Sequence, residues 1–248
     1  MYGPSLAPHW IDWLAVGLLV VVAPLLSAFV NIPKLRALSP EQQHKVRPGL
    51  YVQTMLTLWL FGAAALWPIL DGRTDVHAMG LVPAGDWRGA AGAGGVLVLV
   101  VAMLWQRAQI MKMDDGRAVL QQALTKIEFI IPRDQKQRRL WVLLSVHAGV
   151  FEELFYRAFL VLLLTGFVGQ WGAMALSVLA FALAHLYQGA RGVVLTGMIG
   201  AAMTGLCLLS GSIWPAVVAH ALYDIHAGNL GYWALTPRTD TGTKQGDV

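Results

Sequence analysis

The chain has 248 residues, of which 56% are apolar and only 13% charged, and its mean hydropathy is +0.57. Soluble domains carry about 25% charged residues, so this composition excludes a water-soluble globule, and its high hydrophobicity excludes a disordered chain. The single cysteine, Cys207, excludes an intrachain disulfide and a Cys-rich zinc module. These features indicate an integral membrane protein.

Seven apolar stretches are long enough to cross a bilayer, because a helix needs about 20 apolar residues to span roughly 30 Å of hydrocarbon. An eighth span results if the stretch Leu140–Gly169 is broken. The first stretch is not a cleaved signal peptide, since no Lys or Arg precedes Lys34. The predicted fold is an all-α polytopic membrane protein, a bundle of seven to eight transmembrane helices. The seven stretches are Ile11–Val30, Leu50–Leu70, Gly89–Trp105, Leu140–Thr165, Trp171–Tyr187, Val193–Leu209 and Ile213–Trp233.

Basic residues are unevenly divided between the loops. With seven spans, fifteen of the eighteen Lys and Arg residues lie on one side, and only Arg73 and Arg88 lie on the other. Cytoplasmic loops of membrane proteins carry such an excess, so we expect a cytoplasmic C-terminus and an external N-terminus. An eighth span would reverse one terminus. The same bias explains the net charge of +4 without a nucleic-acid partner.

The loop between the third and fourth spans has two features typical of a membrane surface. Residues Arg117–Ile131 form an amphipathic pattern that ends at Pro132, which predicts a helix in the headgroup plane. The basic run Arg133–Arg139 is interpreted as a lipid-headgroup anchor rather than a nucleic-acid site. The short polar tail after Thr236 is expected to be disordered.

Ionisable side chains cluster inside the later spans, whereas the first three spans hold almost none. Such groups cost several kcal/mol each in hydrocarbon, so a cluster of them indicates function. The candidate catalytic residues are Glu152, Glu153, Arg157, His185, His220 and Asp224.

Helical spacing suggests how these residues divide their roles. Glu153 and Arg157 are four residues apart with the acid first, the favourable order for a helical ion pair. Glu152 is rotated by about 100° from Glu153, so it can point into a cavity. His220 and Asp224 share one face, and Asp224 is expected either to hold the imidazole in one tautomer or to bind a reacting group.

This set of side chains is suited to activating water. Glu152 is expected to act as the general base, while one or both histidines, with Asp224, stabilise the oxyanion of a tetrahedral intermediate. Covalent catalysis is disfavoured, because neither Ser145 nor Cys207 has a base at helical spacing.

Three motifs on successive spans resemble the CAAX-protease and bacteriocin-processing family of intramembrane endopeptidases. The resemblance covers roughly residues 132–228, with Ser212–Ala216 also similar. The sequence departs from the family at Ala158, where glycine is frequent, and at Asp224, where characterised proteases often have asparagine. The motifs read Glu152-Glu153-x-x-x-Arg157, Phe181-x-x-x-His185 and His220-x-x-x-Asp224.

The resemblance implies an intramembrane endopeptidase acting on a membrane-associated protein or peptide. No cofactor is favoured, although Glu152, His185 and His220 are candidate ligands for a divalent metal such as zinc. Phe181, Tyr156 and Tyr223 are candidates for the wall of the substrate cavity, with simple packing as the alternative for the two tyrosines.

Glu152 and His185 are expected at different depths in the membrane, and this difference predicts an unusual turn after His185. Glu152 lies about 18 Å along its helix from Leu140, near the middle of the membrane, whereas His185 lies only about 5 Å from the end of its span at Gln188. Both line one cavity only if that helix end is sunk in the protein. We therefore predict that Gln188–Gly192 is a non-helical segment below the cytoplasmic surface.

The predicted organisation is an N-terminal group of spans with the amphipathic segment (1–131), a C-terminal catalytic membrane core (132–236) and a polar tail (237–248). The expected location is the cytoplasmic membrane of a bacterium, with membrane lipids and a protein or peptide substrate as partners. Two other functions remain open at this stage: a proteolytically silent scaffold of the same family, and a proton-coupled transporter. The residues specify neither the substrate nor the oligomeric state.

Overall fold

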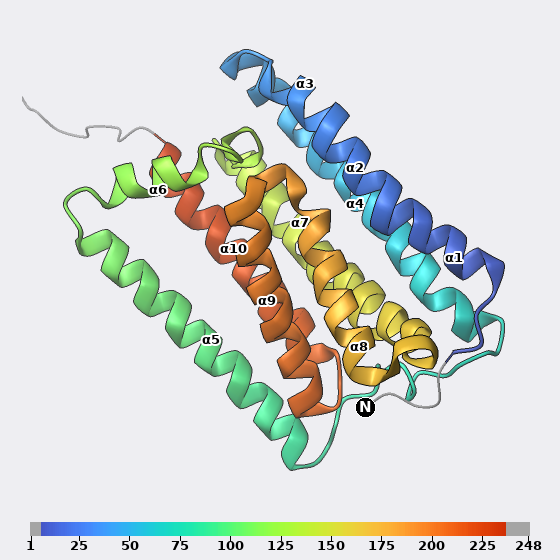
Figure 1. Cartoon of the computed structure of the whole chain (residues 1–248). Coiled ribbons are helices and arrows are strands. Elements are labelled where there is room, and N and C mark those ends of the chain that lie inside the picture. The colour runs from blue at the N-terminus through green and yellow to red at the C-terminus, as the bar shows by residue number, and fades with distance from the viewer. Residues whose placement is uncertain (1–5, 237–248) are drawn as a thin grey trace, which may run out of the picture.

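The computed structural model describes residues 6–236, and every regular element in that range is a helix (Figure 1). This confirms the predicted all-α membrane fold. The predicted tail, 237–248, lies outside the described residues. The elements are α1 (Trp10–Val16), η1 (Gly17–Val22), α2 (Ala23–Leu26), η2 (Ser27–Asn31), α3 (Ile32–Arg36), α4 (Pro40–Leu70), α5 (Trp87–Lys112), α6 (Gly116–Leu124), η3 (Glu128–Ile130), α7 (Gln135–Glu153), η4 (Leu154–Leu160), α8 (Val161–Ala184), η5 (Leu186–Gln188), α9 (Gly189–Ser210) and α10 (Trp214–Leu235).

Five segments within the described residues are long and apolar enough to span a membrane. One of them, Gln135–Ala184, contains two helices that meet at Gly169, and α10 is not among the five. The count of seven to eight spans therefore stays a prediction. The five are Trp10–Arg36, Pro40–Leu70, Trp87–Lys112, Gln135–Ala184 and Leu186–Ser210.

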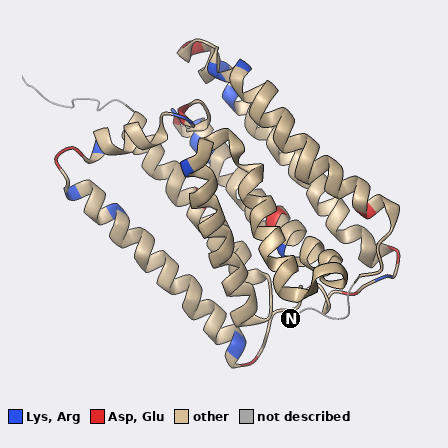
Figure 2. Ribbon diagram, viewed as in Figure 1, with Lys and Arg blue, Asp and Glu red and all other residues tan. Residues whose placement is uncertain are grey.

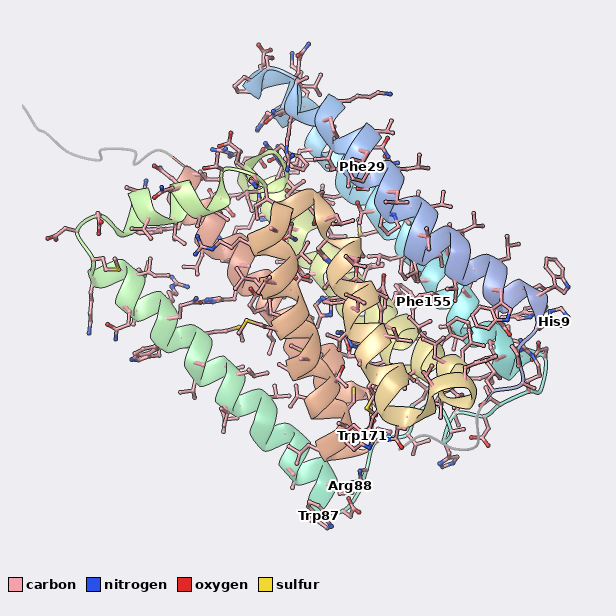
Figure 3. The ribbon with its side chains drawn as sticks, in the orientation of Figure 1. His9, Phe29, Trp87, Arg88, Phe155 and Trp171 are labelled. Atoms are coloured by element: carbon pink, nitrogen blue, oxygen red, sulfur yellow. The ribbon has the colours of Figure 1, made fainter. Side chains whose placement is uncertain are left out.

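Large apolar side chains cover the outside of the bundle, as expected for a surface that faces lipid. In Figure 3, Phe29 points outward from the N-terminal helices and Phe155 lies among the helices. Phe29 is 71% exposed, whereas Phe155 is fully buried. Trp87 and Trp171 lie at one end of the bundle beside Arg88, where aromatic residues are typical of a membrane interface.

The first five elements form one continuous helical rod, Trp10–Arg36, which we call the N-terminal rod. It packs on α8 and on the short η5 turn. A buried carboxylate ties its start to the loop after α4, because the Asp12 side chain accepts hydrogen bonds from both terminal nitrogens of Arg73. The hydrogen bond to Asp12 is the main cause that raises the pKa of the Arg73 guanidinium.

The core of the bundle is built around α7 and the helix that continues it. Helix α7 packs between α4 and α10, and η4 continues α7 with seven consecutive buried residues. Helix α5 differs, since it packs mainly on α6, α9 and α10 and buries little of its surface. Its middle stands apart from the other helices in Figure 1.

The chain reverses at Gly169, and no break occurs before it in the stretch Leu140–Gly169. Gly169 has a φ of 69°, a left-handed value that glycine adopts without strain. After it the chain runs back beside η4, as the hydrogen bond from the Ser177 hydroxyl to the Tyr156 carbonyl shows. Residues from Gln135 to Val168 remain helical through the wider turns of η4.

The predicted non-helical segment Gln188–Gly192 is wrong by about one helical turn. Helix α8 already ends at Ala184, η5 follows, and α9 begins at Gly189, so residues 190–192 are helical. Gly189 has a φ of 80°, so one residue accomplishes the change of direction that we expected of five. The depth of this turn in the membrane stays a prediction.

The predicted amphipathic helix Arg117–Ile131 is also too long. Helix α6 ends at Leu124, where the Thr125 hydroxyl bonds to the carbonyls of Gln121 and Gln122, an arrangement that competes with helical continuation. Helix α6 lies across the C-terminal end of α10 (Figure 1). Most Lys and Arg residues gather at this end of the bundle (Figure 2).

Candidate active site

The candidate residues lie where α7, α8 and α10 come together. Glu152 and Glu153 end α7, Arg157 follows in η4, His185 caps the end of α8, and His220 and Asp224 lie one turn apart on α10. The contacts described below join these residues into one cluster, although the three segments are far apart in the chain.

Glu153 is the centre of this cluster. Its Oε1 accepts a hydrogen bond from Arg157 Nη1 at 3.0 Å and a second from His220 Nδ1 at 2.7 Å. The side chains of Glu153 and Arg157 are both 0% exposed. The helical pair predicted from spacing is therefore present, but the same carboxylate also holds a histidine from another helix, which spacing did not predict.

The guanidinium of Arg157 connects the cluster to the neighbouring helices. Arg157 Nη2 donates to the Gly200 carbonyl of α9 at 3.1 Å. Its Cζ lies 4.2 Å from the centre of the Phe181 ring, within range of a cation–π interaction. A charged residue in the protein interior is thus neutralised by one carboxylate and stabilised by a carbonyl and a ring.

Glu153, rather than Asp224, fixes the tautomer of His220. Because a carboxylate only accepts, the 2.7 Å contact requires a proton on Nδ1 and leaves Nε2 free to face the opposite side. Glu152 Oε2 and Asp224 Oδ2 lie 3.8 Å and 3.7 Å from that Nε2. These distances exceed a direct hydrogen bond, so a water or a substrate oxygen can bridge the groups.

The two adjacent glutamates differ sharply in exposure. The Glu152 side chain is 19% exposed and that of Asp224 is 30% exposed, whereas Glu153 is completely buried. The helical rotation between neighbouring residues separates them in this way. Glu152 and Asp224 therefore form the open side of the cluster, and Glu153 forms its buried base.

His185 joins the cluster through the Phe181 ring. The centre of this ring lies 5.0 Å from the His185 imidazole and 5.7 Å from that of His220. His185 Nδ1 lies 2.9 Å from the Phe181 carbonyl, which accepts only, so Nδ1 carries a proton and Nε2 is the acceptor nitrogen of the neutral ring.

The three candidate wall residues occupy different environments. Phe181 lies between both histidines and Arg157, as described above. Tyr156 is 1% exposed and packs edge-on against Phe181 at 5.3 Å. Tyr223 is half-buried on α10 and, among the described residues, makes no side-chain hydrogen bond. The structure thus places two of the three beside the cluster.

The sequence analysis missed two residues at this site: Tyr187, two residues after His185, and Arg36, which reaches the same turn from a distant segment. Tyr187 in η5 lies with its ring centre 5.9 Å from that of His185. Its carbonyl accepts a hydrogen bond at 2.6 Å from Arg36 Nη2, which also donates to the Lys126 carbonyl at 2.7 Å. The end of the N-terminal rod therefore holds the turn that follows His185. No local pattern signals this contact, which spans 151 residues.

The predicted metal ligands do not form a metal-binding set. Among residues 6–236, no group of three or more His, Cys, Asp or Glu side chains is arranged to hold a metal ion. Zinc requires such donors at about 2.0–2.2 Å from a common centre. We therefore derive no chemical step through a metal at this site.

Gly149 allows α7 to approach α10 closely enough for Glu153 to reach His220. A Cβ at Gly149 would lie 2.8 Å from the Val217 carbonyl oxygen and 3.0 Å from the Ala221 Cβ. We expect Gly149→Ala to lower the free energy of unfolding by about 1–3 kcal/mol, because backbone atoms must move apart. Thermal unfolding of the purified protein measures this effect.

The matched control is Gly205→Ala on α9, where a Cβ would meet no atom within 4 Å. This control is expected to keep the unfolding temperature of the wild type. Equal behaviour of the two variants would show that the α7–α10 contact tolerates a methyl group and would contradict the prediction.

The fold and the cluster together define an integral membrane protein that holds a carboxylate–histidine site inside a helical bundle. Residues 135–226 match the family model described as type II CAAX prenyl endopeptidase Rce1-like. This match confirms the resemblance seen in the three motifs, and all six candidate catalytic residues lie within it. No curated protein and no solved structure is significantly similar to the chain. The match over this segment supports a protease type of hydrolase activity.

Proposed function

We propose that the protein is an intramembrane endopeptidase that hydrolyses a peptide bond of a membrane-associated protein or peptide with water activated by Glu152. One observation carries the proposal: Glu152 and Asp224 approach the free Nε2 of His220, whose Nδ1 is held by the buried Glu153. A general base, a bridging space and an oriented imidazole are the parts that water activation requires.

Glu152 is the carboxylate best placed to take the proton of the attacking water. Its side chain is partly exposed and makes no direct hydrogen bond among the described residues, whereas Glu153 is buried and engaged by two donors. In this mechanism the water oxygen attacks the scissile carbonyl carbon and one proton passes to Glu152. The same proton then goes to the leaving amine as the C–N bond breaks.

The two histidines are suited to different tasks. Each ring uses its Nδ1 proton within the protein, so Nε2 donates to an oxyanion only when the ring carries a second proton. Three carboxylates surround His220, and their negative charge stabilises its imidazolium form. We therefore assign oxyanion stabilisation to the His220 imidazolium, with Asp224 supporting its positive charge, and water positioning through Nε2 to His185.

A chelation experiment tests the metal-free form of this proposal. Cleavage by the purified protein is expected to be unchanged after incubation with EDTA or phenanthroline, because the candidate ligands are not arranged to hold a metal ion and the proposed steps use none. The measurement is the cleavage rate before and after chelation. A loss of activity that added Zn²⁺ restores would instead establish a metal-dependent mechanism.

The function and the substrate are tested together by comparing the membrane proteomes of strains that carry wild-type protein or Glu152→Ala. A protease predicts an uncleaved precursor that accumulates only in the variant strain. A silent scaffold predicts identical peptide patterns in both strains.

We also propose a cytoplasmic C-terminus in a bacterial cytoplasmic membrane, supported by the basic residues gathered at one end of the bundle (Figure 2).

A further inference from the structure

A small cavity with both polar and apolar lining lies between α5, α7 and α10, near the end of the bundle where α6 packs on α10. Its volume is about 160 Å³. The cavity is separate from the candidate active site, since none of the six candidate catalytic residues lines it. Its lining includes Arg107 and Met111 of α5, Arg138 of α7, and Asn229, Tyr232 and Trp233 of α10.

The cavity carries two positive charges, and no acidic side chain lines it among the described residues. Arg138 Nε donates to the neutral Asn229 Oδ1 at 2.7 Å, and its Cζ lies 5.5 Å from the centre of the neutral Tyr232 ring. Arg107 makes no hydrogen bond or ion pair within residues 6–236. Neither guanidinium is therefore neutralised by a carboxylate.

Neighbouring arginines at the same end of the bundle are already engaged. Arg117 donates to the Thr236 carbonyl, and Arg133 donates to the Leu235 carbonyl and lies 3.7 Å from Glu128. These contacts complete the C-terminal end of α10, where carbonyl groups lack helical partners. The basic run Arg133–Arg139 is thus not one uniform anchor, since Arg133 serves the fold and Arg138 faces the cavity.

The remaining features of the cavity fit a phosphate group. Guanidinium groups bind phosphate oxygens through paired, charge-assisted hydrogen bonds, and the amide of Asn229 and the hydroxyl of Tyr232 add neutral donors. Tyr232 and Trp233 are the amphipathic residues favoured at headgroup depth. The cavity also lies at the end where basic residues gather, which is the end expected to meet anionic lipid (Figure 2).

We propose that this cavity binds the phosphate group of an anionic ligand between Arg107 and Arg138. Two sources share this chemistry: the headgroup of an anionic phospholipid and free inorganic phosphate. The proposal is independent of the catalytic mechanism, because it uses none of the residues assigned to the reaction.

The test measures the unfolding temperature of the full chain in a maltoside detergent with three added probes. The probes are dioctanoyl phosphatidylglycerol, inorganic phosphate, and dioctanoylglycerol, which has the same acyl chains without phosphate. We expect phosphatidylglycerol to raise the unfolding temperature in a saturable way and dioctanoylglycerol to leave it unchanged. A saturable rise with inorganic phosphate alone would support the site with free phosphate as its ligand. The proposal would be overturned if phosphatidylglycerol and dioctanoylglycerol raised the unfolding temperature equally. It would also be overturned if neither phosphatidylglycerol nor inorganic phosphate raised it.

Variants then locate the binding. Arg107→Gln/Arg138→Gln is expected to weaken phosphatidylglycerol binding about tenfold or more, since both charged donors are lost. The matched control is Arg139→Gln, which removes one charge next to Arg138 but does not line the cavity. The single variants Arg107→Gln and Arg138→Gln provide the same reading if the double variant does not fold. Equal binding in the cavity variants and the control would refute the assignment.

Discussion

Replacing Glu152 with glutamine is expected to lower the rate of peptide-bond cleavage by about 10²- to 10⁴-fold, the usual contribution of a general base. Glutamine keeps the shape of the side chain but cannot accept a proton from water. The fold is expected to survive, because the Glu152 side chain is 19% exposed and its nearest charged partner, His220 Nε2, is 3.8 Å away. The measurement is precursor cleavage by purified protein, with the unfolding temperature recorded for the same samples.

The matched control for this variant is Glu41→Gln, which also removes one carboxylate. The Glu41 side chain is 78% exposed and pairs with Lys45 at the surface, far along the chain from the candidate site. Cleavage by this control should equal that of the wild type. If Glu152→Gln cleaves as fast as the control, the assignment of Glu152 as the base fails.

Replacing the adjacent Glu153 with alanine is expected to remove activity as well, but together with the stability of the fold, which Glu152→Gln keeps. Both Glu153 and Arg157 are 0% exposed, so removing one partner leaves an uncompensated charge inside the protein. Breaking a buried pair in this way costs about 3–5 kcal/mol of stability. We expect Glu153→Ala and Arg157→Ala to accumulate poorly and to unfold at lower temperature than Glu152→Gln.

A double variant separates the structural from the catalytic part of this effect. Glu153→Gln/Arg157→Met removes both charges and fills similar volume, so it is expected to regain much of the stability lost by the single variants. It should remain inactive, because the amide that replaces the Glu153 carboxylate still accepts from His220 Nδ1 but carries no negative charge to support the ring as an imidazolium. Cleavage by the double variant at the wild-type rate would show that Glu153 serves the fold alone.

Much of the site follows from local sequence rules. Positions four apart on a helix share a face, so the Glu153–Arg157 contact and the shared face of His220 and Asp224 were predictable from spacing. The difference between Glu152 and Glu153 follows equally from the rotation per residue. The three motifs are also local patterns, and all three lie within residues 135–226, the segment that matches the family model.

Errors arose where a single backbone angle or a local hydrogen bond decided the outcome. Helix α8 ends at Ala184, earlier than expected, and the chain changes direction at Gly189, which has a positive φ. Nothing in the sequence indicates which glycine of this segment adopts such an angle. The amphipathic pattern after Arg117 continues beyond the point where the Thr125 hydroxyl ends α6. Patterns of polarity report which face is buried but not where hydrogen bonding stops.

The hydropathy and helical spacing of the sequence were enough to predict an all-α membrane protein. They also predicted which ionisable residues belong to the polar cluster. Only the tertiary structure decided that Glu153 holds His220 across 67 residues, that Arg36 holds the turn after His185, and that two arginines face one cavity. The physical reason is that hydropathy and residue spacing report only on the length and the faces of a single helix. Contacts between helices depend instead on how closely their backbones pack, and this is set by residues such as Gly149 together with their partners on the facing helix.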